Sequence, residues 1–549
     1  MNRRGSYEKI AEDGGGVSFK RDKRASVWVW IVAALLIIAL FGGVGALVYF
    51  TTVAREETVV PLWQRVSAES VRVHLVELQA IATNSSGNRA AGTIGYNRSV
   101  DYVVDQLHRN ASGFYDVEVQ PFSAMQFRIQ PSLFSLVQPF SVPFVQQQQF
   151  EVVRGSMNGT VQAGISLASA FGCNATDFGA DAAGKLALVS RKVAGTAGQC
   201  DVATVMATAK AAAAVGVIFI ADGIGLRLTF NGASGATTPI PAIVASQALQ
   251  SALATANVTA LVTVVAEFQA VPTMNVCASS RSGRNDSVIL ISTHLDSVQA
   301  GPGINDNGSG SMSSLAVALA AAAANITFKS QLRFCYWGAE ELGLLGSTFY
   351  AASLAPEQLN AISIVANFDM LGSTNGVLYI NKVNQNSTTI DAVTKLASLH
   401  IEELFEEFFN MRGKAWLPTP IDNPGRSDYA AFLAVGIPAG GLATGAEEEK
   451  SVAQQHVFGG LQGAQMDPCY HEACDTIDNI NLDFLDSNVQ AIAFTVERLG
   501  LHQNVTAWLD ANATLPLPNA TQSEIEIDVS AAVAAAVDWT AFEAEIWRV

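Results

Sequence analysis

The sequence predicts an α/β protein with a mixed, largely parallel central sheet flanked by helices, a second α/β domain inserted into the first, and one N-terminal transmembrane helix. Strand-like apolar segments alternate with helical patterns beyond residue 271. A segment of different composition interrupts the chain from 138 to 268, and residues 27–50 carry no charge. The strand-like segments are 288–292, 332–337 and 362–368, and the helical patterns are 311–324, 391–407 and 487–501.

Length and composition exclude several classes of protein. A chain of 549 residues predicts about two to four domains. Its 49% hydrophobic and 15% charged residues exclude a disordered or coiled-coil protein. The net charge of −17 argues against a nucleic-acid partner, because phosphate binding needs the opposite sign.

The uncharged run at 27–50 is long enough for a tilted helix to cross the hydrocarbon core of a membrane. Basic residues precede it and place the N-terminus in the cytoplasm by the positive-inside rule. They are Lys20, Arg21, Lys23 and Arg24. We therefore expect a single-pass type II membrane protein with a cytoplasmic tail at 1–26 and a signal-anchor at 27–50. The rest of the chain is then extracellular or in the lumen of a vacuole or lysosome.

Two features of the remaining chain agree with that location. Glycosylation sequons of the form Asn-x-Ser/Thr follow the anchor, and none precedes it. They lie at Asn84, Asn97, Asn110, Asn158, Asn174, Asn257, Asn285, Asn325, Asn386, Asn504, Asn512 and Asn519. Asn307 also fits the pattern, but it falls within the metal site argued below. The six cysteines all follow the anchor too, which indicates disulfides, although six cysteines allow 15 pairings.

The chain beyond the anchor divides into four segments. Residues 55–137 and 269–505 are assigned to one domain, 138–268 to an insertion, and 506–549 to a C-terminal tail. The insertion combines short apolar strands with an alanine-rich helix, and it contains no histidine. It is therefore predicted to be a non-catalytic domain.

Residues able to bind a metal follow each of the three strands predicted beyond residue 271. The first strand runs into His294 and Asp296, the second into Glu340 and Glu341, and the third into Asp369. Ligands of open α/β sheets collect at the carboxyl ends of the strands, so these side chains are expected to converge.

Two further segments add to this set. A glycine-rich loop at 301–310 carries Asp306, and its glycines let the backbone turn sharply. His471 lies in a short loop between Cys469 and Cys474, which a disulfide could hold. Two histidines and several carboxylates are the ligands expected for Zn²⁺, and two neighbouring metals need one bridging carboxylate.

The adjacent acids Glu340 and Glu341 can have different roles. On an extended chain successive side chains point to opposite sides. One can bind metal while the other faces a metal-bound water, which is the nucleophile, and acts as its general base.

The order and spacing of these residues resemble the M28 family of di-zinc peptidases, which includes bacterial secreted aminopeptidases and vacuolar aminopeptidase Y. The resemblance covers about residues 65–505, and the insertion at 138–268 resembles a protease-associated (PA) domain. It implies a zinc exopeptidase fold. The motifs that carry it are THLDSV, GINDNGSG, YWGAEELGLLGS, NFDMLGS, GRSDYAAF and CYHEACDT, together with an upstream segment at 87–103.

The resemblance implies two zinc ions per chain and a role for each ligand. His294 and Asp369 would bind one zinc, Glu341 and His471 the other, and Asp306 would bridge them.

It also implies roles for residues that do not bind the metal. Glu340 would be the general base, Asp296 would orient His294, and Tyr470 would donate to the developing oxyanion. Arg426 and Asp428 lie where the family shapes its substrate site.

Disulfides Cys173–Cys200 and Cys469–Cys474 follow from the resemblance as well. Cys277 and Cys335 are left open as a pair or as two buried thiols, the latter being commoner for strand cysteines.

The function expected from these observations is that of a zinc-dependent exopeptidase, an aminopeptidase acting on peptide substrates. Two alternatives remain. A carboxypeptidase like glutamate carboxypeptidase II shares the anchor and domain plan, but it has a long helical dimerisation domain and clustered arginines that this sequence does not obviously supply. A non-catalytic receptor like the transferrin receptor would have lost metal ligands, which are intact here.

Overall fold

The computed structural model describes residues 60–192, 197–221, 226, 228, 237–421 and 426–510. Among these residues no helix has the length and apolar character needed to cross a membrane. The predicted signal-anchor at 27–50, the cytoplasmic tail and most of the C-terminal tail lie outside the described residues.

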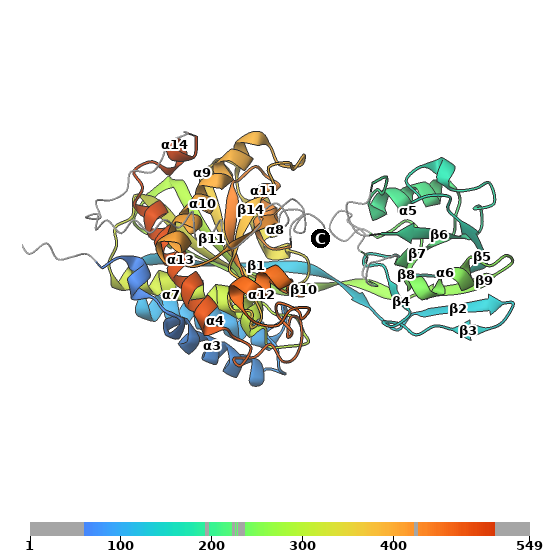
Figure 1. Ribbon diagram of the computed structural model, residues 1–549, viewed down its shortest axis with the longest axis horizontal. Helices are drawn as coiled ribbons and strands as arrows, with labels where there is room; N and C mark the ends of the chain where they lie inside the picture. The colour runs from blue at the N-terminus through green and yellow to red at the C-terminus, as the bar shows by residue number, and fades with distance from the viewer. Residues whose placement is uncertain are drawn as a thin grey trace, which may run out of the picture. The chain divides into compact units, whose positions relative to one another are not determined.

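The first of the two sheets has eight strands in the order β1-β10-β12-β11-β13-β16-β14-β15 (Figure 1). In that order they span Tyr115–Ile129, Ala266–Ser280, Ser330–Trp337, Arg284–His294, Ile362–Phe368, Ala439–Ala443, Tyr379–Val383 and Leu417–Ile421. Four central strands pair with one another in parallel; they are, in order, β12, β11, β13 and β16. Antiparallel pairs stand on both sides of them, so the mixed α/β character predicted for this part of the chain is confirmed.

Helices cover both faces of this sheet. One face carries α3 (Ala68–Thr83), α4 (Ile94–Asn110), α7 (Gly310–Ala323), α10 (Ala392–Met411) and α13 (Leu482–Leu501), whose apolar residues share one core with the sheet. The opposite face carries α8 (Leu345–Ser353), α9 (Pro356–Ala361) and α11 (Tyr429–Leu433). Shorter elements complete this part; they are η1 (Leu62–Arg65), η4 (Ile304–Ser309), α12 (Val452–Phe458) and α14 (Val505–Asp510).

Side-chain caps fix where several of these helices begin. Asp391 accepts hydrogen bonds from backbone N–H groups at the start of α10, and Asn481 does the same for α13. Ser67 forms a capping box with Ser70 at the start of α3. Each cap satisfies backbone donors that have no partner within the helix.

The second sheet also has eight strands, in the order β3-β2-β9-β5-β6-β7-β8-β4. They span Val142–Pro143, Leu133–Gln138, Thr259–Val264, Gly159–Leu167, Leu186–Arg191, Gly216–Ala221, Ala242–Ser246 and Phe150–Val152. Short helices accompany them; they are η2 (Ala175–Asp177), α5 (Val202–Ala211), η3 (Gln247–Leu249) and α6 (Gln250–Leu253). The domain boundaries proposed from the sequence stay a prediction.

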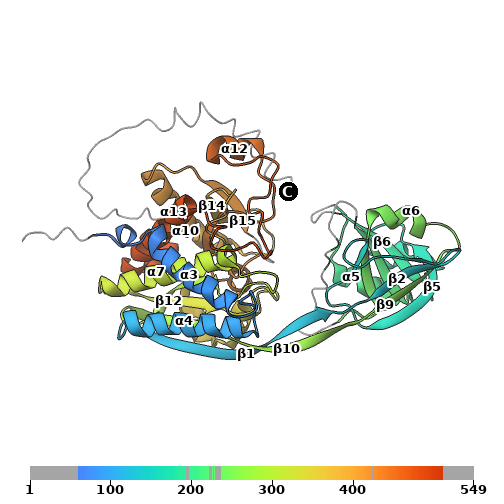
Figure 2. The same ribbon diagram turned by 90° about the horizontal axis from the view of Figure 1, so that it is seen from below.

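Strands β1 and β10 are each 15 residues long and form one continuous antiparallel ribbon. Their register runs without interruption from Tyr115 opposite Ser280 to Ile129 opposite Ala266. The chain enters the second sheet from β1 and returns through β10, and Figure 2 shows the two strands side by side along their length. Because the insertion leaves and returns through two strands that pair with each other, it does not interrupt the pairing of β10 with β12 in the first sheet.

All six cysteines form disulfides, which join Cys173 to Cys200, Cys277 to Cys335 and Cys469 to Cys474. The sequence left the middle pair open and favoured buried thiols. Its two members face each other directly on β10 and β12, and only the register of these strands brings them together.

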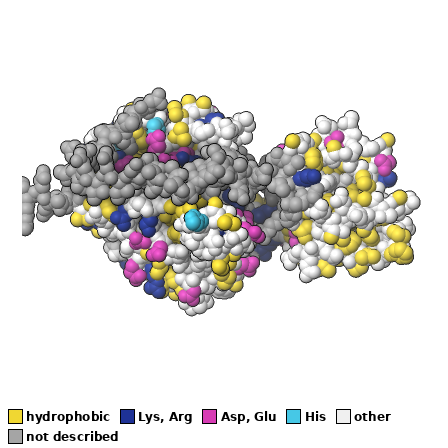
Figure 3. Space-filling model, viewed as in Figure 1, with side chains coloured by type: hydrophobic (Ala, Val, Ile, Leu, Met, Phe, Trp, Pro, Cys, Tyr) yellow, Lys and Arg dark blue, Asp and Glu magenta, His cyan; other side chains and the backbone are white. Residues whose placement is uncertain are grey.

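The surface shows where the predicted glycosylation sequons and the charged side chains lie. The sequon asparagines that lie within the described residues are all exposed, as glycosylation requires, whereas Asn307 is fully buried. Asn512 and Asn519 lie outside the described residues. On the face seen in Figure 3, Lys and Arg side chains lie scattered among acidic ones.

Candidate metal centre

The metal centre forms at the carboxyl ends of three adjacent parallel strands. β11 lies between β12 and β13 in the sheet, and His294 is its last residue. Glu340 and Glu341 follow the end of β12 by a few residues, and Asp369 directly follows β13. Since the three strands run in one direction, their ends bring these side chains to the same edge of the sheet.

Asp306 reaches this edge from the loop between β11 and α7. The loop turns at Gly303, which has a left-handed backbone with φ of +62°. A Cβ at this position would lie 2.3 Å from the backbone oxygen of Asp306 and 2.5 Å from the Cβ of Ser297. Glycine is therefore required where the loop closes on itself.

The side chains gather into two groups of three that share Asp306. In the first group, His294 Nε2 lies 3.3 Å from Asp306 Oδ1 and 3.3 Å from Asp369 Oδ1. In the second, His471 Nε2 lies 3.1 Å from Asp306 Oδ2 and 3.1 Å from Glu341 Oε2. Each group offers one imidazole nitrogen and two carboxylate oxygens within 4.8 Å of one another.

The donor set and its electrostatics fit zinc. Nitrogen and oxygen donors from His, Asp and Glu are the ligands that Zn²⁺ takes in proteins. Asp369 Oδ1 and Glu341 Oε1 are buried and have no hydrogen-bond partner among the described residues. Burial and the nearby charge of Asp306 together raise the pKa of Glu341 to about 7, against the opposing effect of His471. Carboxylates held this closely repel one another, and a cation between them removes the repulsion.

Glu340 stands beside both groups and belongs to neither. Its Oε2 lies 4.0 Å from His294 Nε2, and its side chain is 10% exposed. Burial raises its pKa well above the usual range, and the charges of Asp428 and Glu341 act in the same direction, while His294 opposes them. The structure thus separates the adjacent acids, with Glu341 in a ligand group and Glu340 next to it.

Asp296 supports this arrangement through its backbone and its side chain. His294 Nδ1 lies 3.1 Å from the backbone oxygen of Asp296 and 3.6 Å from its carboxylate. The same carboxylate accepts a hydrogen bond from the backbone N–H of Glu340 at 3.1 Å. The sequence predicted that Asp296 orients His294, and the shorter of the two contacts is made by its backbone.

The remaining predicted residues occupy different depths. Tyr470 stacks on His471 with ring centroids 3.8 Å apart. Arg426 lies at the surface and donates to both carboxylate oxygens of Glu447, at 2.8 and 2.7 Å. Asp428 is fully buried and accepts a hydrogen bond from Ser347 at 2.5 Å, and burial raises its pKa to about 7. The two residues predicted to shape the substrate site are therefore unlike, one at the rim and one beneath it.

Arg89 was missed as a site residue, although it lies in the upstream segment at 87–103. Its fully buried guanidinium donates to the backbone oxygens of Leu295, Pro302 and Gly303, the last two at 2.8 and 2.6 Å. These oxygens belong to the loop that connects His294 to Asp306, so Arg89 fixes the spacing of two predicted ligands. The signal was its place in the run Gly87-Asn-Arg-Ala-Ala-Gly92 of that segment.

Asp475 was missed as well. Its carboxylate accepts hydrogen bonds from the backbone N–H groups of Asn305 and Asp306, both at 2.9 Å. It directly follows the disulfide loop of His471, so it ties the loops of Asp306 and His471 together. No signal in the sequence indicated this contact beyond the position of Asp475 after Cys474.

Ser427 donates a hydrogen bond to Asp369 Oδ2 at 2.6 Å. It stands between the predicted residues Arg426 and Asp428 in the sequence. This contact occupies one oxygen of Asp369 and leaves Oδ1 directed to the other members of its group.

Comparison with known proteins gives two family matches. Peptidase family M28 matches residues 275–496, and the PA domain family matches residues 157–253. An aminopeptidase of Pseudomonas aeruginosa is 37% identical over 455 residues, which cover 80% of this chain and 82% of that protein.

Two solved structures are similar in fold. An aminopeptidase from Aneurinibacillus sp. strain AM-1 superposes with a TM-score of 0.62 at 25% identity, over 80% of this chain and 95% of that one. A zinc aminopeptidase from Bacillus subtilis superposes with a TM-score of 0.55 at 24% identity, over 78% of this chain and 94% of that one.

We expect Arg89→Lys to lower the thermal stability of the protein. A lysine cannot serve three carbonyl oxygens in the geometry of a guanidinium, and each buried acceptor left without a donor costs about 1–3 kcal/mol. A fall in melting temperature of about 5 °C is expected by differential scanning calorimetry. The matched control is Arg109→Lys, at an exposed arginine paired with Asp105. Equal melting temperatures for the two variants would contradict this role of Arg89.

Proposed function

The chain belongs to peptidase family M28, and we propose that it is a zinc-dependent aminopeptidase that removes N-terminal residues from peptides. One observation carries the proposal. Two ligand groups share a single carboxylate, Asp306, and a further buried carboxylate, Glu340, stands beside them without joining either. This arrangement provides both a place for metal and a separate base.

Two zinc ions per chain fit the two groups. His294 and Asp369 would hold one ion, Glu341 and His471 the other, and the two oxygens of Asp306 would each face one ion. Support comes from the distances, since Oδ1 of Asp306 lies near His294 and Oδ2 near His471. A carboxylate that offers one oxygen to each of two metals is the bridge that a two-metal site needs.

Zinc, when bound, supplies a Lewis acid that polarises the peptide carbonyl and lowers the pKa of water. The carboxylate of Glu340 accepts a proton from the attacking water and returns it to the amine that leaves. Its buried position suits this role, because desolvation raises the pKa of Glu340 and so favours the uptake of a proton.

Other residues of the chain position the reaction. The backbone oxygen of Asp296 holds the ring of His294, and its carboxylate holds the backbone N–H of Glu340. Tyr470, stacked on His471, would donate its hydroxyl proton to the carbonyl oxygen as negative charge develops there.

Charge around the site favours a substrate with a free α-ammonium group. The carboxylate of Glu340 stands beside both ligand groups, and in its ionised form it can attract a cation. Arg426 at the rim is paired with Glu447 and so is not free to bind a substrate carboxylate. This balance favours an aminopeptidase over a carboxypeptidase.

The cellular setting is part of the proposal. Residues 1–26 would be a cytoplasmic tail and 27–50 a type II signal-anchor, with the peptidase and PA-like segments outside the cytoplasm. Three disulfides and exposed sequon asparagines support this location, because disulfides persist in oxidising compartments. The PA-like segment at 138–268 would shape access to the peptidase without contributing to the chemistry.

Glu340→Gln should abolish turnover while the protein keeps its zinc. Glutamine cannot accept the proton, so we expect kcat/KM for a peptide substrate to fall by about 10²–10⁴-fold. Zinc content is measured on the same sample by mass spectrometry. Glu357→Gln, an exposed glutamate in α9, is the matched control and should behave as wild type. Loss of zinc from the Glu340 variant would show that Glu340 and Glu341 have exchanged roles.

His471→Ala should reduce the zinc content from two ions per chain to one. His471 belongs to one ligand group only, so the group of His294 stays complete. The measurement is zinc per chain by mass spectrometry, with His456→Ala, an exposed histidine of α12, as the control. Two ions per chain in the His471 variant would contradict the assignment.

A further inference from the structure

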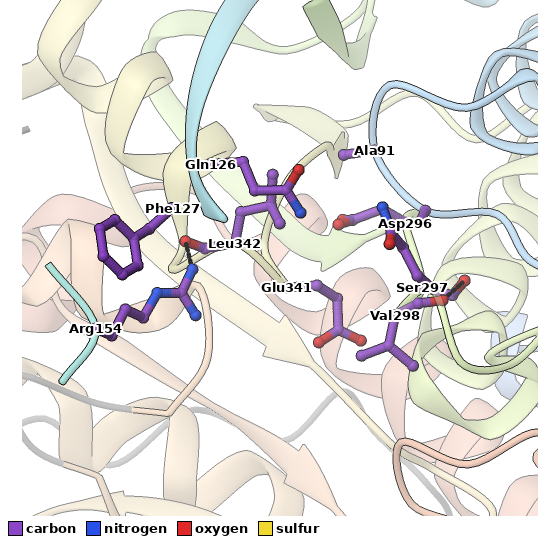
Figure 4. A pocket seen from close by; sticks show the side chains of 11 residues that line it. Ala91, Gln126, Phe127, Arg154, Asp296, Ser297, Val298, Glu341 and Leu342 are labelled. Carbon is purple, nitrogen blue, oxygen red and sulfur yellow. Dashed lines mark hydrogen bonds between the residues drawn. The ribbon is translucent and has the colours of Figure 1, made fainter. Parts of the chain in front are cut away.

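A cavity of about 240 Å³ opens beside the metal centre. Glu341, a predicted ligand, lies in its wall together with Asp296, and Leu342 follows Glu341 directly. The opposite wall brings in a residue from the inserted segment, Arg154, which follows β4. Figure 4 shows the Arg154 guanidinium directed to the backbone oxygen of Leu342, with Glu341 between Arg154 and Asp296 in this view.

The guanidinium of Arg154 has an unusual set of contacts. Its Nη2 donates to the backbone oxygen of Leu342 at 2.8 Å. Within the described part of the chain no carboxylate forms an ion pair with it, and Nε and Nη1 have no hydrogen-bond partner. This is unexpected in a chain with 49 acidic and 32 basic residues.

Partial burial makes this lack of a partner significant. Burial lowers the pKa of Arg154, which means that its surroundings disfavour the positive charge. A guanidinium removed from water is normally compensated by a bidentate anion, most often a carboxylate or a phosphate. Arg154 lines the cavity, so a compensating anion could reach it there from solvent.

We propose that Arg154 binds a carboxylate of the peptide substrate on the leaving side of the scissile bond. This inference rests on the proposed function. The carboxylate is either the C-terminus of a short peptide or the side chain of an acidic residue after the bond, since both present the same group. Arg154 is thereby a specificity-determining residue contributed by the inserted segment.

The position of Arg154 indicates the leaving side. It binds the backbone of Leu342, the residue next to the ligand Glu341, so its guanidinium lies close to the metal centre. A positive charge there repels the α-ammonium of the substrate, which must therefore point away from this cavity. The part of the peptide that enters the cavity is the part released after cleavage.

Polar groups around the cavity can accompany a bound carboxylate. Gln126 on β1 lines the wall. Its Oε1 accepts a hydrogen bond from Arg128, so its amide NH₂ group is left to donate to a bound carboxylate. Ser297 and Gln299 lie on the opposite wall. These three side chains are neutral and can add hydrogen bonds, whereas Asp296 and Glu341 in the same wall carry carboxylates, so Arg154 is the positive charge that this wall offers to an anion.

The test compares matched peptides on the zinc-loaded full chain. One pair is Leu-Ala and Leu-Ala-NH₂, which differ in the C-terminal carboxylate. The other is Leu-Glu-NH₂ and Leu-Gln-NH₂, which differ in the side-chain carboxylate. The ratio of kcat/KM within each pair is measured for wild type, Arg154→Gln and Arg154→Lys. Arg281→Gln is the matched control, because Arg281 is an exposed arginine at the end of the same ribbon, paired with Asp116 and outside this cavity.

We expect wild type to prefer the carboxylate-bearing member of at least one pair by about tenfold, the value of one charge-assisted hydrogen bond. Arg154→Gln should abolish that preference, Arg154→Lys should retain part of it, and Arg281→Gln should keep it. The pair that shows the preference identifies the source of the carboxylate. Because each ratio compares two substrates on one variant, a partly misfolded fraction does not change it.

Several results would overturn the inference. They are the absence of a preference in wild type, an unchanged preference in Arg154→Gln, and an equal loss in Arg281→Gln. The last result would show that the positive charge of any arginine near the ribbon has the same effect. Cleavage of the neutral peptides by wild type keeps the proposed aminopeptidase function whatever the ratios are. If wild type cleaves none of the four peptides, both the function and this inference fail.

Discussion

The mutual repulsion of buried carboxylates is the constraint on which the site depends. Asp306, Glu341 and Asp369 are drawn together with Glu340 at one edge of the sheet, where burial raises the pKa of Glu340 and of Glu341. Such a cluster is stable only if cations lie within it. The two imidazoles are placed between the carboxylates, and the geometry leaves room for metal in each of two groups that share Asp306.

The fold meets this constraint by fixing the loops rather than the strands alone. Parallel strands bring His294 and Asp369 to one edge, but Asp306 and His471 come from loops that have no pairing of their own. Arg89 holds the first of these loops by its carbonyl oxygens, and Asp475 holds its N–H groups. Rigid loops keep the ligands close enough for a shared carboxylate to face both groups.

The sequence predicted much of this site because its ligands occur at the ends of strands with a clear apolar pattern. The expectation that one of Glu340 and Glu341 is a base and the other a ligand came from the alternation of an extended chain, and the resemblance to family M28 assigned the role of each. Arg89 and Asp475 could not be predicted in the same way, since both act on backbone groups that any sequence presents. The Cys277–Cys335 disulfide depended on the register of β10 with β12, and Arg154 depended on contacts between distant segments, neither of which the local pattern encodes.

The central claim is cleavage from the free N-terminus, and one experiment tests it directly. Residues 55–549 are secreted from a eukaryotic host, and zinc-loaded protein is given one peptide of about ten residues in free, N-acetylated and C-amidated forms. At this length the C-terminus lies beyond the cavity of Arg154. Mass spectrometry should show stepwise loss of N-terminal residues from the free and amidated forms and none from the acetylated form. Cleavage that survives acetylation but stops on amidation would contradict the account and identify a carboxypeptidase.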